Sequence, residues 1–276
     1  MQARLIVEGY MSGEHKSPFR GFSVEFTQHR EYVPGDDTRH LDWKVLGRTD
    51  RYYVKQYEAQ TNYVAQLLVD ASESMAYGSG GITKLDYAKK LAACLAYVIL
   101  SQRDAVAMSV FDADLRTHVP RTGNLASIHN LLTTLAAMKP TAKTDVAAVL
   151  HRIASTTPRR GIVILLSDLF DDELKVLDGV QHLRFIGHEV IVFHVLDPCE
   201  IEFPFQGTVE FDALEDVARV MTRPSEIRKS YLREMNAFRD RVREGCERNR
   251  CDYVLTNTSQ SLHEVLGGYL ALRGRT

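Results

Sequence analysis

The fold is decided by the stretch GIVILLS at residues 161–167. The run is short, apolar up to its last residue and rich in β-branched side chains, which predicts a strand that is buried on both faces. A similar run, YVAQLLVD at residues 63–70, occurs earlier in the chain. Strands of this kind are typical of parallel sheets, because crossover helices cover both sides of such a sheet.

Amphipathic segments lie between the predicted strands. Residues 85–102 place Leu85, Ala88 and Ala92 at the spacing of one helical face. By the same reasoning we expect helices over residues 125–138, 145–155 and 172–185, and further strands over residues 105–111 and 189–195. Repeated strand–helix units of this length predict an α/β protein with a doubly wound, mostly parallel sheet of the Rossmann type.

Two regions flank this central pattern. After it, the sequence predicts a long charged helix over Pro224–Asn249, a short strand over Asp252–Thr256 and a last helix over Ser261–Arg273. We expect these elements to pack on the same sheet, so that residues 61–276 form one domain. Residues 1–60 differ, because glycines and the turn signal Pro34-Gly35 interrupt short β-type runs. We expect them to form a small β-rich N-terminal appendage.

The composition excludes several classes of protein. The chain has 276 residues, a formal net charge of −2, 45% hydrophobic residues and 25% charged residues, which is typical of a soluble globular protein. The near-neutral charge disfavours a nucleic-acid partner, because nucleic-acid-binding domains are usually strongly basic. The longest apolar stretch, Leu91–Leu100, is about half of the ~20 residues that a membrane span needs. The four cysteines form no CxxC pair or zinc spacing, so we expect free thiols in a cytoplasmic protein with no membrane span.

Polar residues gather where the predicted strands end. Asp70, Ser72 and Ser74 follow the first strand, and Asp168 follows the GIVILLS strand. Thr144 stands at the start of a predicted helix, which begins at the same edge. Ligands of open parallel sheets bind at the carboxyl ends of the strands. Oxygen donors alone suit a hard divalent cation, so we expect a Mg²⁺ site, with Mn²⁺ as the alternative ion, formed by Asp70, Ser72, Ser74, Thr144 and Asp168.

The same residues have structural alternatives. The hydroxyl groups of Ser72 and Ser74 can bond the backbone of a polar turn, and threonine at position 144 is a natural N-cap residue. Asp145 is expected to bond backbone groups in its loop. The charged segment Arg30–Lys44, which contains the single tryptophan, is expected to hold the N-terminal appendage on the sheet domain, with a recognition surface as the alternative.

Two motifs carry a resemblance to known families. The order Asp70-x-Ser72-x-Ser74, then Thr144 and Asp168, resembles the metal-ion-dependent adhesion site of von Willebrand factor type A domains. The segment REYVPGDDTRHLDWK at residues 30–44 resembles the hallmark segment of the domain of unknown function 58 family, and the similarity covers nearly the whole chain. The resemblance implies a von Willebrand A-like fold and a Mg²⁺ ion bound by the residues of the first motif.

The resemblance also implies partners. A bound Mg²⁺ with an open coordination position would accept a carboxylate from a protein partner. The resemblance to the domain of unknown function 58 family implies that this partner is a MoxR-type AAA+ ATPase. Many members of that family begin with membrane helices. This sequence shows none, so we expect a cytosolic partner.

These observations leave three classes of function open. We expect a non-enzymatic, metal-dependent protein-binding module that works with a MoxR-type AAA+ ATPase in a chaperone-like or assembly role. The alternative is a Mg²⁺-dependent hydrolase that uses the same cation to activate water. Against the hydrolase, no general base is evident beside the site, and Gly78–Gly81 lacks the Lys-Ser/Thr of a P-loop. RNA binding, the third class, is disfavoured by the net charge of −2.

Overall fold

The structure is a computed structural model that describes residues 23–33, 41–60, 64–141, 143–157, 160–211 and 220–273. The described residues belong to two compact units. One unit comprises the described residues within Ser17–Tyr63, and the other comprises those from Val64 onward. Among the residues described, no helix is both long enough and apolar enough to cross a membrane.

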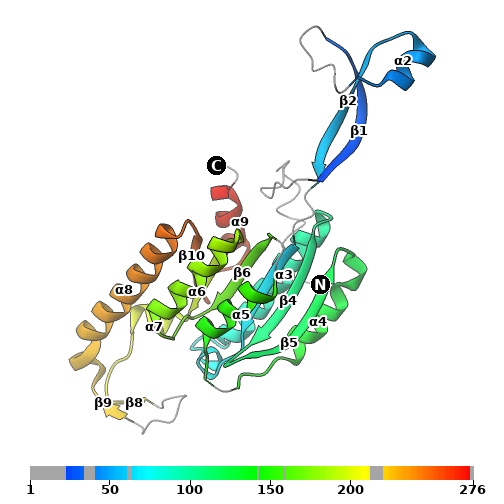
Figure 1. The fold of residues 1–276 in the computed structure, drawn as a ribbon. Helices are drawn as coiled ribbons and strands as arrows, with labels where there is room; N and C mark the ends of the chain where they lie inside the picture. Colours follow the sequence, from blue (N-terminus) through cyan, green and yellow to red (C-terminus); the bar gives the residue numbers. More distant parts are fainter. Residues whose placement is uncertain are drawn as a thin grey trace. The chain divides into compact units, whose positions relative to one another are not determined.

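A six-stranded sheet forms the centre of the larger unit, counted over the described ranges (Figure 1). Its strands are β3 (Val64–Asp70), β4 (Ala105–Phe111), β5 (Leu115–Thr122), β6 (Ile162–Ser167), β7 (Glu189–Leu196) and β10 (Asp252–Asn257). They lie in the order β10–β7–β6–β3–β4–β5, and β4 with β5 is the antiparallel pair, whereas the other neighbours are parallel. The predicted α/β class with a mostly parallel sheet is confirmed. The edge strand β5 is absent from the sequence-based prediction.

The order of the strands reverses beside β3. From β3 the chain moves outward through β4 and β5, and it then crosses to the other side of β3 to form β6, β7 and β10. β3 and β6 are therefore neighbours, with Leu67 opposite Ile164. Such a reversal is a topological switch point, where the loops after neighbouring strands diverge and leave a crevice for ligands. β3 and β6, the two strands that the apolar runs in the sequence predict, therefore end side by side.

Helices cover both faces of this sheet. Their bounds are α3 (Lys84–Ser101), α4 (Ile128–Ala137), α5 (Val146–Thr156), α6 (Glu173–Ile186), α8 (Pro224–Arg248) and α9 (Leu262–Arg273). α5, α6 and α8 lie along one face (Figure 1). On the opposite face, α3 packs with α4, and the ring of Tyr269 in α9 meets Phe193 of β7 edge to face at 5.5 Å between centroids. This cover on both sides is the doubly wound arrangement that the sequence predicts.

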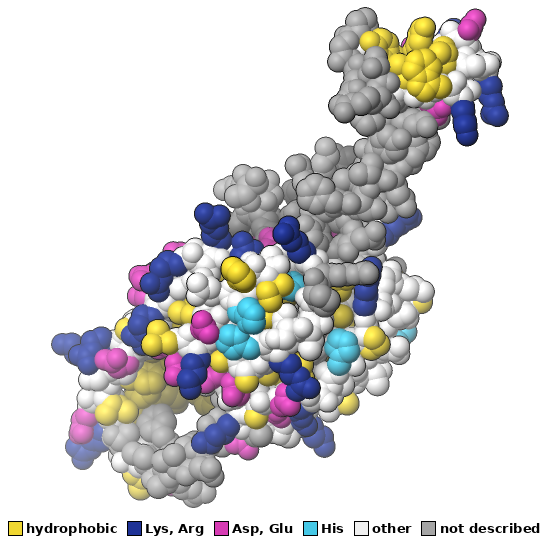
Figure 2. Space-filling model, viewed as in Figure 1, with side chains coloured by type: hydrophobic (Ala, Val, Ile, Leu, Met, Phe, Trp, Pro, Cys, Tyr) yellow, Lys and Arg dark blue, Asp and Glu magenta, His cyan; other side chains and the backbone are white. Residues whose placement is uncertain are grey.

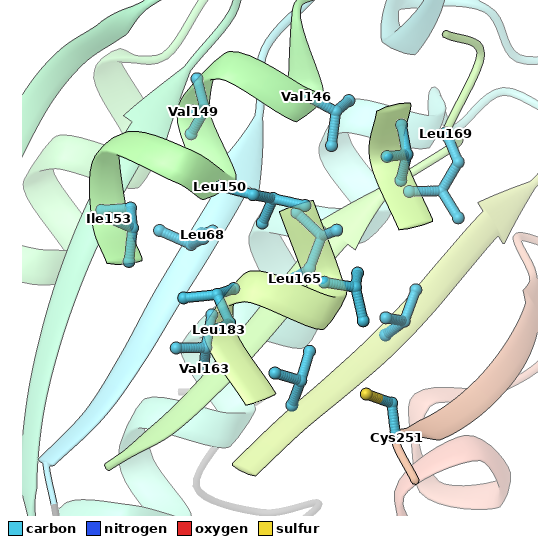
Figure 3. Close-up of a cluster of buried hydrophobic side chains, with 14 of the residues drawn as sticks. Leu68, Val146, Val149, Leu150, Ile153, Val163, Leu165, Leu169, Leu183 and Cys251 are labelled. Atoms are coloured by element: carbon cyan, nitrogen blue, oxygen red, sulfur yellow. The ribbon is translucent and has the colours of Figure 1, made fainter. Parts of the chain in front are cut away.

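The core beneath α5 and α6 is apolar and closely packed (Figure 3). Leu68 of β3 and Val163 and Leu165 of β6 are at most 1% exposed, and they pack with Leu150 of α5. Alternate residues of a strand point to opposite faces, so the intervening Ile164 faces the other side of the sheet, where it is also buried. Burial on both faces explains why these strands read as continuous apolar runs.

The approach of α5 to α6 depends on a glycine. A Cβ atom at Gly179 of α6 would lie 2.9 Å from the Cβ of Leu150 and 3.4 Å from the carbonyl oxygen of Ala147, both in α5. The first distance is shorter than real Cβ contacts, so a larger residue would force the helices apart.

Short elements connect the main ones. They are the 3-10 helices η2 (Glu73–Ala76) and η3 (Leu125–Ser127), the helix α7 (Pro198–Glu202), and the antiparallel strands β8 (Val209–Phe211) and β9 (Val220–Thr222). α7 begins with a capping box, in which Asp197 accepts a hydrogen bond from the backbone N of Cys199 and Glu200 accepts one from the backbone N of Asp197, both at 2.8 Å. This box fixes the position of Glu200 directly after β7.

The smaller unit contains β1 (Ser23–Glu31), α2 (Trp43–Thr49) and β2 (Tyr53–Gln60), with the strands paired antiparallel. The extent of the predicted β-rich appendage stays a prediction, and the helix α2 is absent from the sequence-based prediction. Asp42 is the N-cap of this helix, because its Oδ1 accepts hydrogen bonds from the backbone N of Lys44 at 3.0 Å and of Val45 at 3.3 Å. Residues 34–40 of the charged segment lie outside the described residues, so its role as a link to the sheet domain stays a prediction.

Candidate functional site

The predicted site residues lie at the switch point of the sheet. Asp70 is the last residue of β3, and Asp168 directly follows β6, the strand that pairs with β3. Ser72 and Ser74 follow Asp70 in the segment that leads into and through η2. The two carboxylates therefore stand at the same edge of the sheet, as predicted from the ends of the two strands.

Asp70 is completely buried, and its carboxylate accepts two hydrogen bonds. The backbone N of Ser72 donates to Oδ1 at 2.9 Å, and Ser167 Oγ donates to Oδ2 at 2.6 Å. Burial, followed by the nearby negative charge of Asp168, raises the pKa of Asp70 from 3.8 to about 7 against the opposing effect of these hydrogen bonds. A bound cation would favour the ionised form of this carboxylate.

The hydroxyl groups of Ser72 and Ser74 lie side by side. Their Oγ atoms are 3.1 Å apart, as expected if the turn points both the same way. Ser72 is completely buried and precedes η2, but its side chain forms no capping hydrogen bond to that helix. The alternative, in which the Ser72 hydroxyl bonds the backbone of a polar turn, is not observed at the start of η2.

Thr144 lies in the loop before α5, and its Oγ1 is buried with no hydrogen-bond partner in the described part of the chain. The capping role falls instead to Asp145, whose Oδ1 accepts from the backbone N of Ala148 at 2.8 Å, so Asp145 bonds the backbone as predicted. The loop is tied to the site, because Thr141 N donates to the carbonyl oxygen of Ala71 at 2.9 Å. A buried unpaired hydroxyl costs about 1–3 kcal/mol, and an added ligand would offset that cost.

Asp168 is completely buried and pairs with a lysine that the sequence reasoning missed. Its Oδ2 accepts a hydrogen bond from Lys84 Nζ at 2.7 Å, and its Oδ1 accepts one from the backbone N of Phe170 at 3.3 Å. Lys84 Nζ also donates to Glu200 Oε1 at 2.6 Å. Burial lowers the pKa of Lys84, but the charges of Asp168 and Glu200 outweigh that effect and raise the pKa above its ordinary value. Lys84 is therefore a cation beside the candidate site.

The helical pattern of the sequence indicates that Lys84 is buried. Lys84 lies four residues before Ala88, so it falls on the buried face of α3. A lysine on an apolar helical stripe requires a buried partner, because an unpaired buried charge is costly. The partner Glu200 lies 116 positions later in the chain, in a short helix that the sequence pattern did not predict.

Asp197 organises the neighbouring end of the sheet. It is completely buried after β7, and its carboxylate accepts hydrogen bonds from the backbone N of Ser79 at 2.9 Å, from Ser79 Oγ, and from Thr258 Oγ1 at 3.4 Å. Ser79 belongs to the glycine-rich segment Gly78–Gly81, which is thereby fixed against the end of β7. The backbone N–H of Ser79 therefore donates to Asp197.

The donor set fits an oxygen-ligated divalent cation. Within the described ranges, no group of three or more His, Cys, Asp or Glu side chains is placed to hold a metal, so a metal at this edge would depend on hydroxyl oxygens as well as carboxylates. The unpaired Oγ1 of Thr144, the adjacent hydroxyls of Ser72 and Ser74, and the buried Asp70 match the oxygen ligands that Mg²⁺ and Mn²⁺ accept. Asp168 differs, because its Oδ2 is already ion-paired with Lys84.

The fold and the site define an open, mostly parallel α/β protein with buried oxygen donors at the switch point of its sheet. The chain belongs to the family described as "Protein of unknown function DUF58", which matches residues 28–241. The family part of the resemblance is thereby confirmed.

One curated relative and two solved structures are similar to this chain. The uncharacterized protein Rv1480 of Mycobacterium tuberculosis is 29% identical over 239 residues, which are 84% of this chain and 74% of that protein. The conserved hypothetical protein BatB from Bacteroides thetaiotaomicron is 19% identical, with a TM-score of 0.54 over 78% of this chain and 100% of that one. An aerotolerance-related membrane protein from Bacteroides fragilis is 18% identical, with a TM-score of 0.53 over 76% and 99%. At these identities the two structures show a shared fold.

Proposed function

We propose that this chain is a non-enzymatic, metal-dependent protein-binding module. Its site would hold Mg²⁺, or Mn²⁺, through Asp70, Ser72, Ser74, Thr144 and Asp168, as in the adhesion site of von Willebrand factor type A domains. The observation that carries the proposal is the buried Oγ1 of Thr144, which has no partner among the described residues and stands at the edge where Asp70 is desolvated.

The chain's own residues have separate tasks in this proposal. Asp70 supplies a carboxylate, and hydrogen bonds from Ser72 N and Ser167 Oγ fix the orientation of that group. The hydroxyls of Ser72, Ser74 and Thr144 supply neutral oxygens, which leave the cation attractive to an outside anion. When bound, the cation would supply a positive centre for an Asp or Glu side chain of a partner protein.

As the partner we propose a MoxR-type AAA+ ATPase, in a chaperone-like or assembly role in the cytoplasm. The support for this identity is the family resemblance of the segment at residues 30–44. The chemistry of the site supports only the wider class, a protein that presents an acidic side chain.

A Mg²⁺-dependent hydrolase is the competing function. It would need a general base with a pKa near neutrality beside the cation. His194 contacts the site, but its Nε2 lies 2.9 Å from the carbonyl oxygen of Asp168 and its Nδ1 lies 2.7 Å from Tyr253 OH. Burial lowers the pKa of His194 to about 4, which makes it a weak base. Asp70 has a pKa of about 7, but in this proposal it binds the cation, which would keep it ionised and engaged. These features favour the binding module.

The test is metal-dependent co-purification from the source cell. We expect partner proteins to be retained by the tagged chain in Mg²⁺, and to be lost in EDTA and in the variants Asp70→Ala and Ser72→Ala. Asp240→Asn is the matched control, because Asp240 is exposed and pairs only at the surface with Arg243. Retention of every partner by both site variants, with unchanged metal content, would overturn the proposal. Turnover of phosphoesters or peptides in Mg²⁺ or Mn²⁺ that depends on Asp70 would support the hydrolase instead.

A further inference from the structure

The ammonium group of Lys84 is buried among two carboxylates and two aromatic rings. Its ammonium group lies 2.7 Å from Asp168 Oδ2 and 2.6 Å from Glu200 Oε1, and the lysine side chain is 1% exposed. The group also lies 4.7 Å from the centroid of the Phe170 ring and 5.9 Å from that of the Tyr77 ring. The charge is therefore held in one place by two carboxylates and two aromatic faces.

The position of this charge matters for a cation bound at the same edge. Asp168, a member of the candidate metal site, is also the direct partner of the ammonium group. Interactions between charges are strong in a buried, weakly polarisable region, so a fixed positive charge must oppose the binding of a second cation close by. Glu200, the other carboxylate that is paired with the ammonium group, acts in the opposite sense.

We propose that Lys84 is a built-in cation of the metal site, which weakens the binding of a divalent ion and keeps the loaded site neutral toward an acidic ligand. The proposal rests on the proposed function and assigns a further residue to it. Glu200 has the complementary role, because it offsets part of the lysine charge from α7.

Formal charges show the consequence for the ligand. With a cation bound, which would favour ionised Asp70, the three carboxylates of Asp70, Asp168 and Glu200 and the ammonium group of Lys84 sum to −2, which one divalent cation neutralises. Without Lys84 the loaded site would carry −1 and would repel an incoming carboxylate. With Lys84 present, metal affinity is reduced and the metal stays open to an acidic partner.

A purely structural role is the alternative. The ion pairs join the start of α3 to the end of β6 and to α7, so Lys84 could serve only to hold these segments together. In that case any variant that disrupts the pairs would loosen the site and weaken metal binding. The electrostatic role predicts opposite effects from Lys84 and Glu200, which distinguishes the two.

The experiment is a titration of the metal-free full chain with Mn²⁺, in which the electron paramagnetic resonance signal reports free Mn²⁺. We expect Lys84→Met to bind Mn²⁺ about tenfold or more tightly than the wild type and Glu200→Gln to bind it more weakly by a similar factor. The double variant Lys84→Met/Glu200→Gln removes one charge of each sign, so its affinity should return to near that of the wild type. Lys89→Met is the matched control, because Lys89 lies on the same helix and pairs with Asp86 at the surface.

The outcomes separate this inference from the proposed function. If the wild type binds no Mn²⁺, or binds it without dependence on Asp70, the proposed function fails and this inference fails with it. If binding depends on Asp70 but Lys84→Met and Glu200→Gln both weaken it, or leave it unchanged, only the role of Lys84 is overturned. If Lys84→Met does not fold, Glu200→Gln decides the matter, because unchanged or tighter Mn²⁺ binding in that variant overturns the electrostatic role of the ion-paired group.

Discussion

Lys84 Nζ lies 2.7 Å from Asp168 Oδ2, and neither side chain is more than 1% exposed. The pair joins the first residue of α3 to the residue that follows β6, across the switch point of the sheet. A pair this deeply buried is costly to break from one side, because the remaining charge has no water to solvate it.

Lys84→Met is therefore expected to lower the free energy of unfolding by about 3–5 kcal/mol. Lys89→Met, which removes a surface ion pair from the same helix, is expected to lower it by less than about 1 kcal/mol. Urea unfolding of both variants beside the wild type measures the difference. Equal effects of the two substitutions would contradict the burial of the Lys84 pair.

Asp70→Asn is expected to stabilise the metal-free protein above pH 7. The pKa of Asp70 is about 7 in the folded chain and 3.8 when unfolded, so between these values the folded state binds more protons and its stability falls as the pH rises. This shift corresponds to roughly 4 kcal/mol at most, and asparagine removes it. Urea unfolding in EDTA should show the variant to be more stable than the wild type.

Adding Mn²⁺ provides the control for that comparison. The wild type should gain stability from the ion, by about 2.7 kcal/mol at a concentration of one hundred times the Kd, whereas Asp70→Asn should gain little. A wild type that is more stable than Asp70→Asn in EDTA above pH 7 would show that Asp70 is not a destabilised carboxylate.

His194 is expected to make the protein sensitive to acid. Its pKa is about 4 when folded and 6.5 when unfolded, so between these values the unfolded state binds more protons and the free energy of unfolding rises with pH. The contribution is fully present above pH 6.5 and is lost as the pH falls toward 4, in total by about 3 kcal/mol.

The variant His194→Gln isolates this contribution, because glutamine does not titrate. The stability of the wild type minus that of the variant, measured by urea unfolding, should shrink as the pH falls through this window. Taking the difference also removes the opposite trend of Asp70, which is common to both proteins. A difference that stays constant with pH would contradict a buried, neutral His194.

Two glycines in helices should respond to alanine with opposite signs. At Gly179 the added Cβ would meet Leu150 of α5 at 2.9 Å, so Gly179→Ala is expected to destabilise the chain by about 1–3 kcal/mol despite its better helix propensity. At Gly268 in α9 nothing lies within 4 Å, so Gly268→Ala should stabilise by up to about 1 kcal/mol. Thermal unfolding of both variants measures this contrast. Stabilisation by both would show that α5 and α6 are not in close contact.

The sequence predicts those parts of the structure that depend on local patterns. Burial on both faces makes β3 and β6 continuous apolar runs, and the rule that parallel strands end at one edge then brings Asp70 and Asp168 together. By contrast, β5 is an exposed edge strand without such a run, and α2 follows its N-cap Asp42 within a segment dense in charges of both signs.

Local sequence patterns also do not predict that Glu200 pairs with Lys84. The lysine stands out on an apolar helical face, but Glu200 reaches it only through the parallel pairing of β6 with β7 and the capping box of α7. Which carboxylate neutralises a buried lysine depends on contacts between segments far apart in the chain, and spacing in one sequence does not contain that information.

The most direct test of the metal site is a crystal structure of the chain grown with Mn²⁺ and compared with one grown in EDTA. The proposed site predicts an anomalous difference peak at the Mn absorption edge, within coordination distance of the hydroxyl oxygens of Ser72, Ser74 and Thr144, that disappears in EDTA. Well-ordered residues at this edge without such a peak, at millimolar Mn²⁺, would contradict the site.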